Sequence, residues 1–171
     1  MKIITAVLVI VTLVAIGVSV WALFFRSDDN GNALLAPDYA PVSIEKYAED
    51  IGDDSASKLE QTEGGGAVSM SYSTEVGISL SEKTVSLFFE NPGKSNQDVV
   101  IQIVIHDTVV AQSGRITPGK RVTMLDLPNN MSSSLEEGGY NGKIVVLYYQ
   151  PENGEKAILN TDIPVNINVS Y

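Results

Sequence analysis

The C-terminal part of the chain, residues 67–171, is built from short runs in which apolar and polar side chains alternate. Alternation is clearest at 68–72, 76–80, 85–89 and 163–169, and a shorter run follows at 122–125. Two further runs, 98–105 and 144–149, are almost continuously apolar. A period of two is typical of a strand with one buried face, and a continuous apolar run is typical of a strand covered on both faces. This region is therefore predicted to be all-β.

Turn residues separate these runs at intervals of about 8–12 residues, which is the spacing expected for short antiparallel strands. Asn153-Gly154 is the strongest hairpin signal, because both residues tolerate the backbone that a tight turn requires. Pro164 lies inside the last run, which predicts an edge position or a strand start. We expect an antiparallel Ig-like β-sandwich of seven to nine strands over 67–171, with an open barrel as the alternative. The chain has no Cys, and its only Trp, Trp21, lies outside this region, so the Cys-Trp-Cys core of antibody domains is absent.

Residues 3–25 form an apolar stretch without a single charge, between Lys2 and Arg26. A helix of 23 residues is about 34 Å long, enough to cross the hydrocarbon core of a membrane. Residues 1–26 are predicted to be an uncleaved transmembrane signal anchor. A cleaved signal peptide is the alternative, although Trp21 makes the best cleavage site a poor one. The positive N-terminal flank and the acidic residues after Arg26 predict a cytoplasmic N-terminus and an extracytoplasmic C-terminal domain.

Residues 27–66 hold ten acidic residues against two lysines, a net charge of -8. They also include two prolines and the run Gly64-Gly65-Gly66. Such a composition buries too little apolar surface to offset chain entropy, so we expect an acidic flexible linker. One short helix behind Ser43 is conceivable from the apolar spacing of Ile44, Tyr47, Ala48 and Ile51.

Few residues of this chain are suited to catalysis or metal binding. It has one His, His106, and its net charge of -10 argues against nucleic-acid partners, which require a basic surface. His106-Asp107 with Ser113 nearby does not make a nucleophilic site by adjacency alone. The acidic run after Asp28 lacks the ligand spacing of a calcium loop. We therefore expect no catalytic, cofactor-binding or metal-binding residues and no cofactor; whether the acidic linker binds cations weakly stays open.

Aromatic residues are the best candidates for contacts with a partner. In an alternating strand, one of Phe88 and Phe89 and one of Tyr148 and Tyr149 should point away from the core. Exposed aromatics on a sheet face can form a binding patch. Phe88, Tyr140, Tyr148 and Tyr149 are the candidate partner-binding residues. The alternative is that these rings pack against one another across strands.

Two stretches carry a resemblance to a known group of proteins. They are SLFFENPGKSNQDVVIQIVIHDTVVAQSGRITPGKRVTMLDLP (86–128) and GGYNGKIVVLYYQPENGEKAILNTDIPVNINV (138–169). Together they resemble small membrane-anchored surface proteins of Gram-positive (Clostridia-type) gut bacteria and, more loosely, bacterial Ig-like adhesion modules. The resemblance covers about residues 64–171, includes no catalytic signature, and implies a fold and a cell-surface location only.

These features together predict a single-pass membrane protein with an extracytoplasmic, non-enzymatic binding or adhesion module. Its expected partners are the membrane and a protein or cell-surface glycan. The alternative is a structural subunit of a surface fibre or membrane-associated assembly. An exposed aromatic patch would favour the first function, whereas an open sheet edge beside Pro164 would favour the second.

Overall fold

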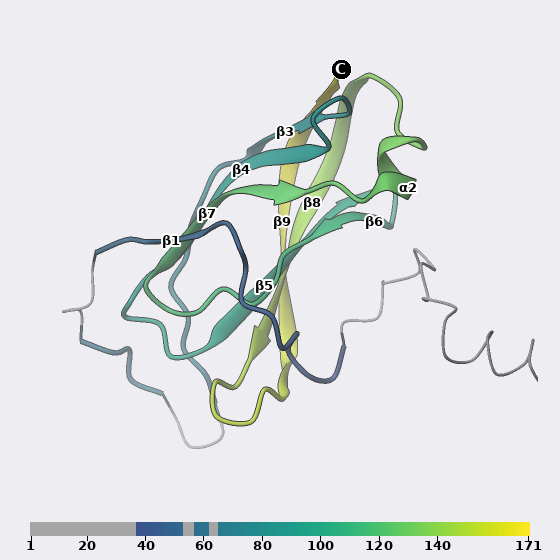
Figure 1. Cartoon of the computed structure of the whole chain (residues 1–171). Coiled ribbons are helices and arrows are strands. Elements are labelled where there is room, and N and C mark those ends of the chain that lie inside the picture. Colours follow the sequence, from purple (N-terminus) through teal and green to yellow (C-terminus); the bar gives the residue numbers. More distant parts are fainter. Residues whose placement is uncertain (1–36, 53–56, 62–64) are drawn as a thin grey trace, which may run out of the picture. The chain divides into compact units, whose positions relative to one another are not determined.

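The computed structural model describes residues 37–52, 57–61 and 65–171 (Figure 1). The predicted membrane anchor, residues 1–26, lies outside these residues, and none of the described helices is both long and apolar enough to span a membrane. The described elements are β1 (Ala48–Asp50), β2 (Ser71–Tyr72), β3 (Glu75–Ser79), β4 (Thr84–Asn91), β5 (Asp98–Ile105), β6 (Thr108–Gln112), β7 (Lys120–Asp126), α2 (Asn129–Ser132), β8 (Gly138–Tyr149) and β9 (Lys156–Ser170).

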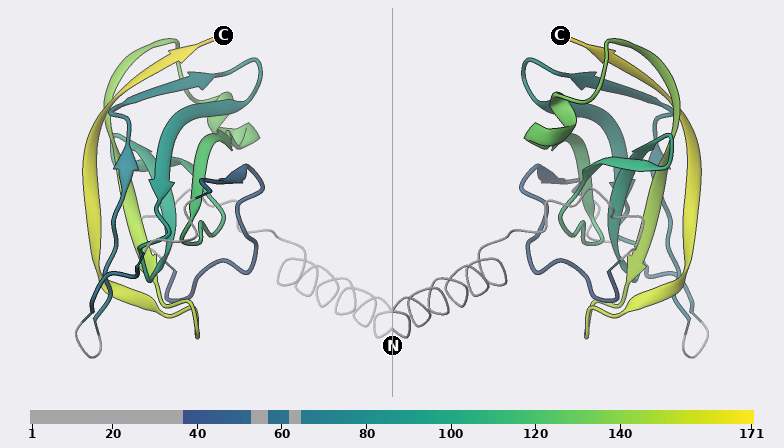
Figure 2. Two further views of the ribbon diagram at one scale, coloured as in Figure 1. Left: turned by 90° about the vertical axis from the view of Figure 1, so that its left-hand side faces the viewer. Right: turned by 90° about the vertical axis from the view of Figure 1, so that its right-hand side faces the viewer.

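The strands form one mostly antiparallel sheet in the order β1-β7-β4-β3-β9-β8-β5-β6, and β2 pairs with β4. The exception is the pair of β3 with β9, which run parallel. The sheet curls, so that the long β8–β9 hairpin lies across from β4 and β7 (Figure 2). This confirms the all-β prediction and the predicted strand number.

A single apolar core fills the space inside the curl. Every strand from β3 to β9 contributes buried side chains to it. Its large, fully buried side chains include Phe89, Ile78, Ile101 and Ile103. The alternation in β4 and β9 arises because one face of each strand packs on this core and the other faces outward.

Strand β5 is buried along its whole length, as its continuous apolar run predicts. Its outer face has a small apolar cluster of its own, made of Val100, Leu147 and Tyr149. Ala40 packs against this cluster, and Pro37 accepts a hydrogen bond from the Tyr149 hydroxyl at 3.2 Å. We call residues 37–52, which include these two positions, the N-terminal strap. The strap therefore covers the ring of Tyr149 on this outer face.

The N-terminal strap corrects the extent of the predicted linker. Residues 37–52 are attached to the sheet rather than solvated: Tyr39 bridges Glu155, Ile44 bridges Arg115, and β1 pairs with β7. The conceivable short helix is wrong as well, because its C-terminal part is β1. The linker residues 27–36, 53–56 and 62–64 lie outside the described part of the chain.

Glu45 explains how an acidic segment can bind the sheet. Its buried carboxylate accepts the amide of Gly114 at 2.6 Å and the amide of Tyr47 at 3.0 Å. Its own amide donates to the Arg115 carbonyl at 2.9 Å. A Cβ on Gly114 would lie 2.8 Å from the Glu45 amide nitrogen, so only glycine allows the strap this close. Hydrogen bonds to a charged group are strong enough to hold an otherwise polar segment in place.

Candidate functional site

The two halves of β9 differ in their neighbours. Strand β8 pairs with β9 along its length, from Lys156 to Val169. Strand β3 pairs with the other side of β9 only from Asn166 to Ser170. Among the described residues, no strand accompanies residues 158–164 on that side. We call residues 158–164 the open edge of β9.

The direction of the backbone shows which groups the open edge presents. The Asn166 amide donates to the Thr74 carbonyl at 2.8 Å, so the backbone of Asn166 faces away from β8. Alternate residues of a strand direct their N–H and C=O groups to the same side. Asn160 and Asp162 therefore present both groups at the open edge, while Pro164 presents only its carbonyl. The edge position predicted for Pro164 is confirmed.

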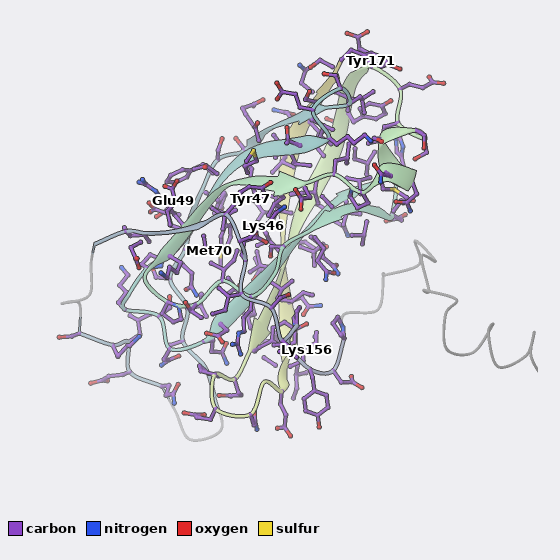
Figure 3. The ribbon with its side chains drawn as sticks, viewed as in Figure 1. Lys46, Tyr47, Glu49, Met70, Lys156 and Tyr171 are labelled. Atoms are coloured by element: carbon purple, nitrogen blue, oxygen red, sulfur yellow. The ribbon has the colours of Figure 1, made fainter. Side chains whose placement is uncertain are left out.

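A groove of about 850 Å³ opens beside this edge. We call it the edge groove. Segment 65–68 lines one side of it, and residues 155–161 line the other. It exists because β2 pairs with β4 while β9 follows β8, so the chain before β3 diverges from β9. Lys156, at the start of β9, lies at the opposite end of the molecule from Tyr171 (Figure 3).

Two large apolar side chains are exposed at the groove. Ile158 is 97% exposed and Leu159 is 75% exposed. Both sit where the β8–β9 register shifts, because Tyr149 pairs with Lys156 but Leu147 pairs with Asn160. A bulge of this kind re-aims side chains and interrupts pairing. Together with Val68, Ala157 and Tyr148, these residues make the groove apolar on part of its surface.

Tyr148 is the one predicted site residue in the edge groove. Its ring is half-buried against the main core, and its hydroxyl lies 2.7 Å from the Thr161 hydroxyl. Burial raises the pKa of the Tyr148 phenol, and the hydrogen bond with Thr161 opposes part of this shift. Tyr148 is therefore a neutral hydrogen-bonding group at neutral pH.

The other three predicted aromatic residues lie elsewhere. Tyr149 is fully buried beneath the N-terminal strap, and burial together with nearby Asp38 raises its pKa to about 12. Phe88 is half-buried on β4, next to the fully buried Phe89. Tyr140 is half-buried near α2 and donates to the Glu136 carbonyl at 2.9 Å. The four residues therefore do not form one aromatic patch.

A second hollowed region surrounds His106, at the β5–β6 turn. Its ring packs edge-on against Tyr140 with centroids 6.0 Å apart, and hollows of about 460 Å³ lie on two sides of it. His106 and Asp107 both have left-handed backbone, with φ of 47° and 63°. One hollow is lined by the Lys143–Asp162 ion pair, whose atoms are 2.8 Å apart, so its charges are already matched.

The groups considered for catalysis do not come together. His106 is exposed at the turn, whereas Ser113 is buried and its hydroxyl accepts the Ile101 amide at 2.9 Å. Within the described ranges, no three His, Asp or Glu side chains are placed to share a metal ion.

Sequence reasoning missed Ile158 and Leu159. Their signal was present, since Ala157-Ile158-Leu159 is an apolar run directly after a polar turn and before Asn160. A run of three apolar residues cannot all face one core in a strand, so at least one side chain had to point outward. No protein-family model matches the chain, and no curated protein is similar enough in sequence to count as a relative.

Proposed function

We propose that this chain is a membrane-tethered, extracytoplasmic binding module without enzymatic activity, and that the edge groove is its binding surface. The single observation that carries the binding part is a groove of about 850 Å³ flanked by Ile158 and Leu159, two exposed apolar residues on a strand with an unpaired edge. Exposed apolar surface next to a concavity is typical of sites that bind partners.

The membrane part of the proposal rests on the sequence. The uncharged stretch at 3–25 is long enough to span a bilayer, and the charges on its two flanks favour a cytoplasmic N-terminus. Cell-surface location is also what the resemblance to Gram-positive surface proteins implies. Residues 27–36, which include Asp28 and Asp29, would then connect the anchor to the folded domain.

The strand order supports an Ig-like sandwich as the scaffold. Strands β1, β7, β4 and β3 follow one another in one half of the sheet, and β9, β8, β5 and β6 follow in the other. The chain crosses between the halves after β4, β6 and β7, which is a Greek-key type of connection. The main core lies between the halves, as in two packed sheets.

Intact mass and fractionation of the native protein test the tether. We expect a full-length mass in the membrane fraction, with the C-terminal domain digested when protease is added outside intact cells. A mass shorter by about the first 22 residues, recovered from the medium, would show that the anchor is a cleaved signal peptide. A full-length protein in the cytosolic fraction would contradict the location altogether.

Site-specific photo-crosslinking tests the binding surface. A photoreactive amino acid replaces Leu159 in the edge groove or, as a matched control, exposed Thr123 on β7. On intact cells we expect a discrete adduct from position 159 that is absent from position 123. The same adducts from both positions, or none from 159, would argue against the groove as the binding surface.

A structural subunit of a surface assembly is the second candidate. The open edge beside Pro164 is the feature expected to favour it, because this edge could pair with another chain of the same protein, whereas the groove with exposed Ile158 and Leu159 favours the binding module. Adducts from position 159 with the mass of two copies of this chain would favour this candidate over the binding module.

A further inference from the structure

We propose that the edge groove binds an extended polypeptide segment, which adds as a strand beside the open edge of β9. This inference rests on the proposed binding function and specifies the partner. It starts from the backbone: Asn160 and Asp162 each offer an N–H and a C=O to that side, and no described strand takes them. An added strand is the ligand that satisfies such a row of groups.

The two ends of the same edge already form backbone hydrogen bonds with other segments of this chain. At one end, the Lys156 amide donates to the Asp38 carbonyl at 2.9 Å and the Ala40 amide donates to the Gly154 carbonyl at 2.8 Å. At the other end, β3 pairs with Asn166–Ser170. The open edge is therefore flanked by the bridge between Tyr39 and Glu155 on one side and by β3 on the other, and a new strand would fill the space between them.

The gap sets the length of the segment. Residues 158–164 span about 23 Å at the usual rise of a strand. The N-terminal strap and β3 close the two ends, so a bound segment has room for about six residues in extended form. A folded surface would not reach the backbone groups between these two obstructions.

The groove sets the side chains of the segment. In an added strand, every second side chain points toward the groove, where Val68, Tyr148 and Leu159 supply apolar surface. Glu155, at the strap end of the groove, is exposed and forms no ion pair with a described residue. Because Lys156 lines the same end of the groove, the charges there are mixed, and the preferred segment is one that alternates apolar with polar residues.

The test uses the full chain, purified in detergent, and a panel of capped hexapeptides. The probe sequence is Lys-Val-Thr-Val-Thr-Val, and in its variants Leu, Ile or Phe replaces Val. Each probe has two N-methylated forms, one methylated on the amides of the odd positions and one on those of the even positions. Only one form blocks the amides that would face β9, so we expect one form to lose binding by about tenfold or more and the other to keep it.

A substitution in the protein tests the same backbone hydrogen bonds, now by removing a donor of β9 instead of a donor of the peptide. Asn160→Pro removes one outward N–H, as Pro164 already does naturally, whereas Asn160→Ala keeps it. We expect the proline variant to bind the best probe about tenfold more weakly and the alanine variant to bind within about twofold. The N-methyl comparison on the unchanged protein remains decisive if the proline variant does not fold.

Hydrogen exchange of the Asn160 and Asp162 amides separates the remaining outcomes. We expect fast exchange in the free protein and slow exchange with the probe. Slow exchange in the free protein at every concentration would mean that another part of the chain covers the edge, and protection that grows with protein concentration would mean a second copy; both overturn the proposal. If no probe binds the unchanged protein but position 159 still gives a photo-adduct, strand addition is wrong and the proposed binding function remains.

Discussion

The two halves of β9 belong to one strand and share one neighbour, β8, yet they differ in whether a second strand pairs with their other side. The C-terminal part, Asn166–Ser170, lies between β8 and β3, and its inward side chains Ile167 and Val169 are buried. The N-terminal half has β8 on one side only, and Ile158 and Leu159 are among the most exposed apolar side chains described.

The difference shows that the pairing and register of a strand against its neighbours, not its sequence alone, decide where its apolar side chains lie. Both halves carry large apolar residues, and Ile163 on the open edge still packs in the core; the exposed residues are Ile158 and Leu159, which lie at the register shift. The chain before β3 turns to β4 instead of following β9, and the edge groove opens where the two separate. A stable part and a part available to a partner thus lie side by side in the same strand.

The largest expected effect comes from the same substitution in the two halves. Ile167→Ala removes a buried side chain and should lower the free energy of unfolding by about 2–4 kcal/mol. Ile158→Ala removes a side chain that is 97% exposed and should change it by less than about 0.5 kcal/mol. Urea unfolding of both variants measures the difference. Similar losses would show that Ile158 is packed rather than available.

Glu45 tests whether the N-terminal strap is part of the fold. Glu45→Ala leaves the amides of Gly114 and Tyr47 without their acceptor and should reduce stability by about 1–3 kcal/mol. Glu49→Ala, a matched control on the same strap, removes only an exposed ion pair with Arg121 and should cost less than about 1 kcal/mol. Equal effects in urea unfolding would mean that residues 37–52 behave as the solvated linker.

The covered outer face should also respond to alkaline pH. The pKa of Tyr149 is raised to about 12 from an ordinary value of 10.0. Between these values the phenol ionises in the unfolded chain before it does so in the folded protein, so stability falls as pH rises. We expect the wild type to lose more stability than Tyr149→Phe between about pH 9 and about pH 11. Parallel curves for the two proteins would show that Tyr149 is not held neutral by burial.

Pro164 gives the smallest effect on stability and a specific effect on association. Pro164→Ala restores an N–H on the open edge, so the variant should self-associate more readily at high concentration. Its free energy of unfolding should stay within about 0.5 kcal/mol of the wild type. Sedimentation velocity measures the association, with exposed Pro151→Ala in the hairpin turn as the control. Unchanged sedimentation would indicate that proline does not protect this edge.

Much of the fold follows from the sequence. Alternation located β3, β4, β7 and the C-terminal half of β9, and continuous apolar runs located β5 and the second half of β8. Strand β6 could not be predicted from its turn. The tight turn before it is made by His106 and Asp107, and neither residue is the glycine or asparagine that usually marks such a turn. Segment 68–72 alternates like a strand, but only Ser71–Tyr72 pairs, since pairing depends on where the neighbouring strand lies.

The candidate site was harder to predict than the fold. Residues 37–52 look like linker by charge, and contacts between residues distant in sequence, such as that of Glu45 with Gly114, show that they bind the sheet. The sequence predicts that one of Tyr148 and Tyr149 points away from the main core; Tyr149 does so, but the N-terminal strap covers it. The sequence predicts the open edge only at Pro164, because proline lacks the N–H that pairing with a further strand would use. The groove could not be predicted, because it forms where two segments remote in sequence diverge.

The most direct measurement is the hydrogen-exchange rate of outward amides along β9 in the full-length, unliganded protein. Asn166 and Asn168, which lie beside β3, should be strongly protected, whereas Asn160 and Asp162 should exchange almost as fast as in an unfolded peptide. Equal protection of all four amides would mean that the edge is closed in the native protein and would contradict the account of the two halves of β9.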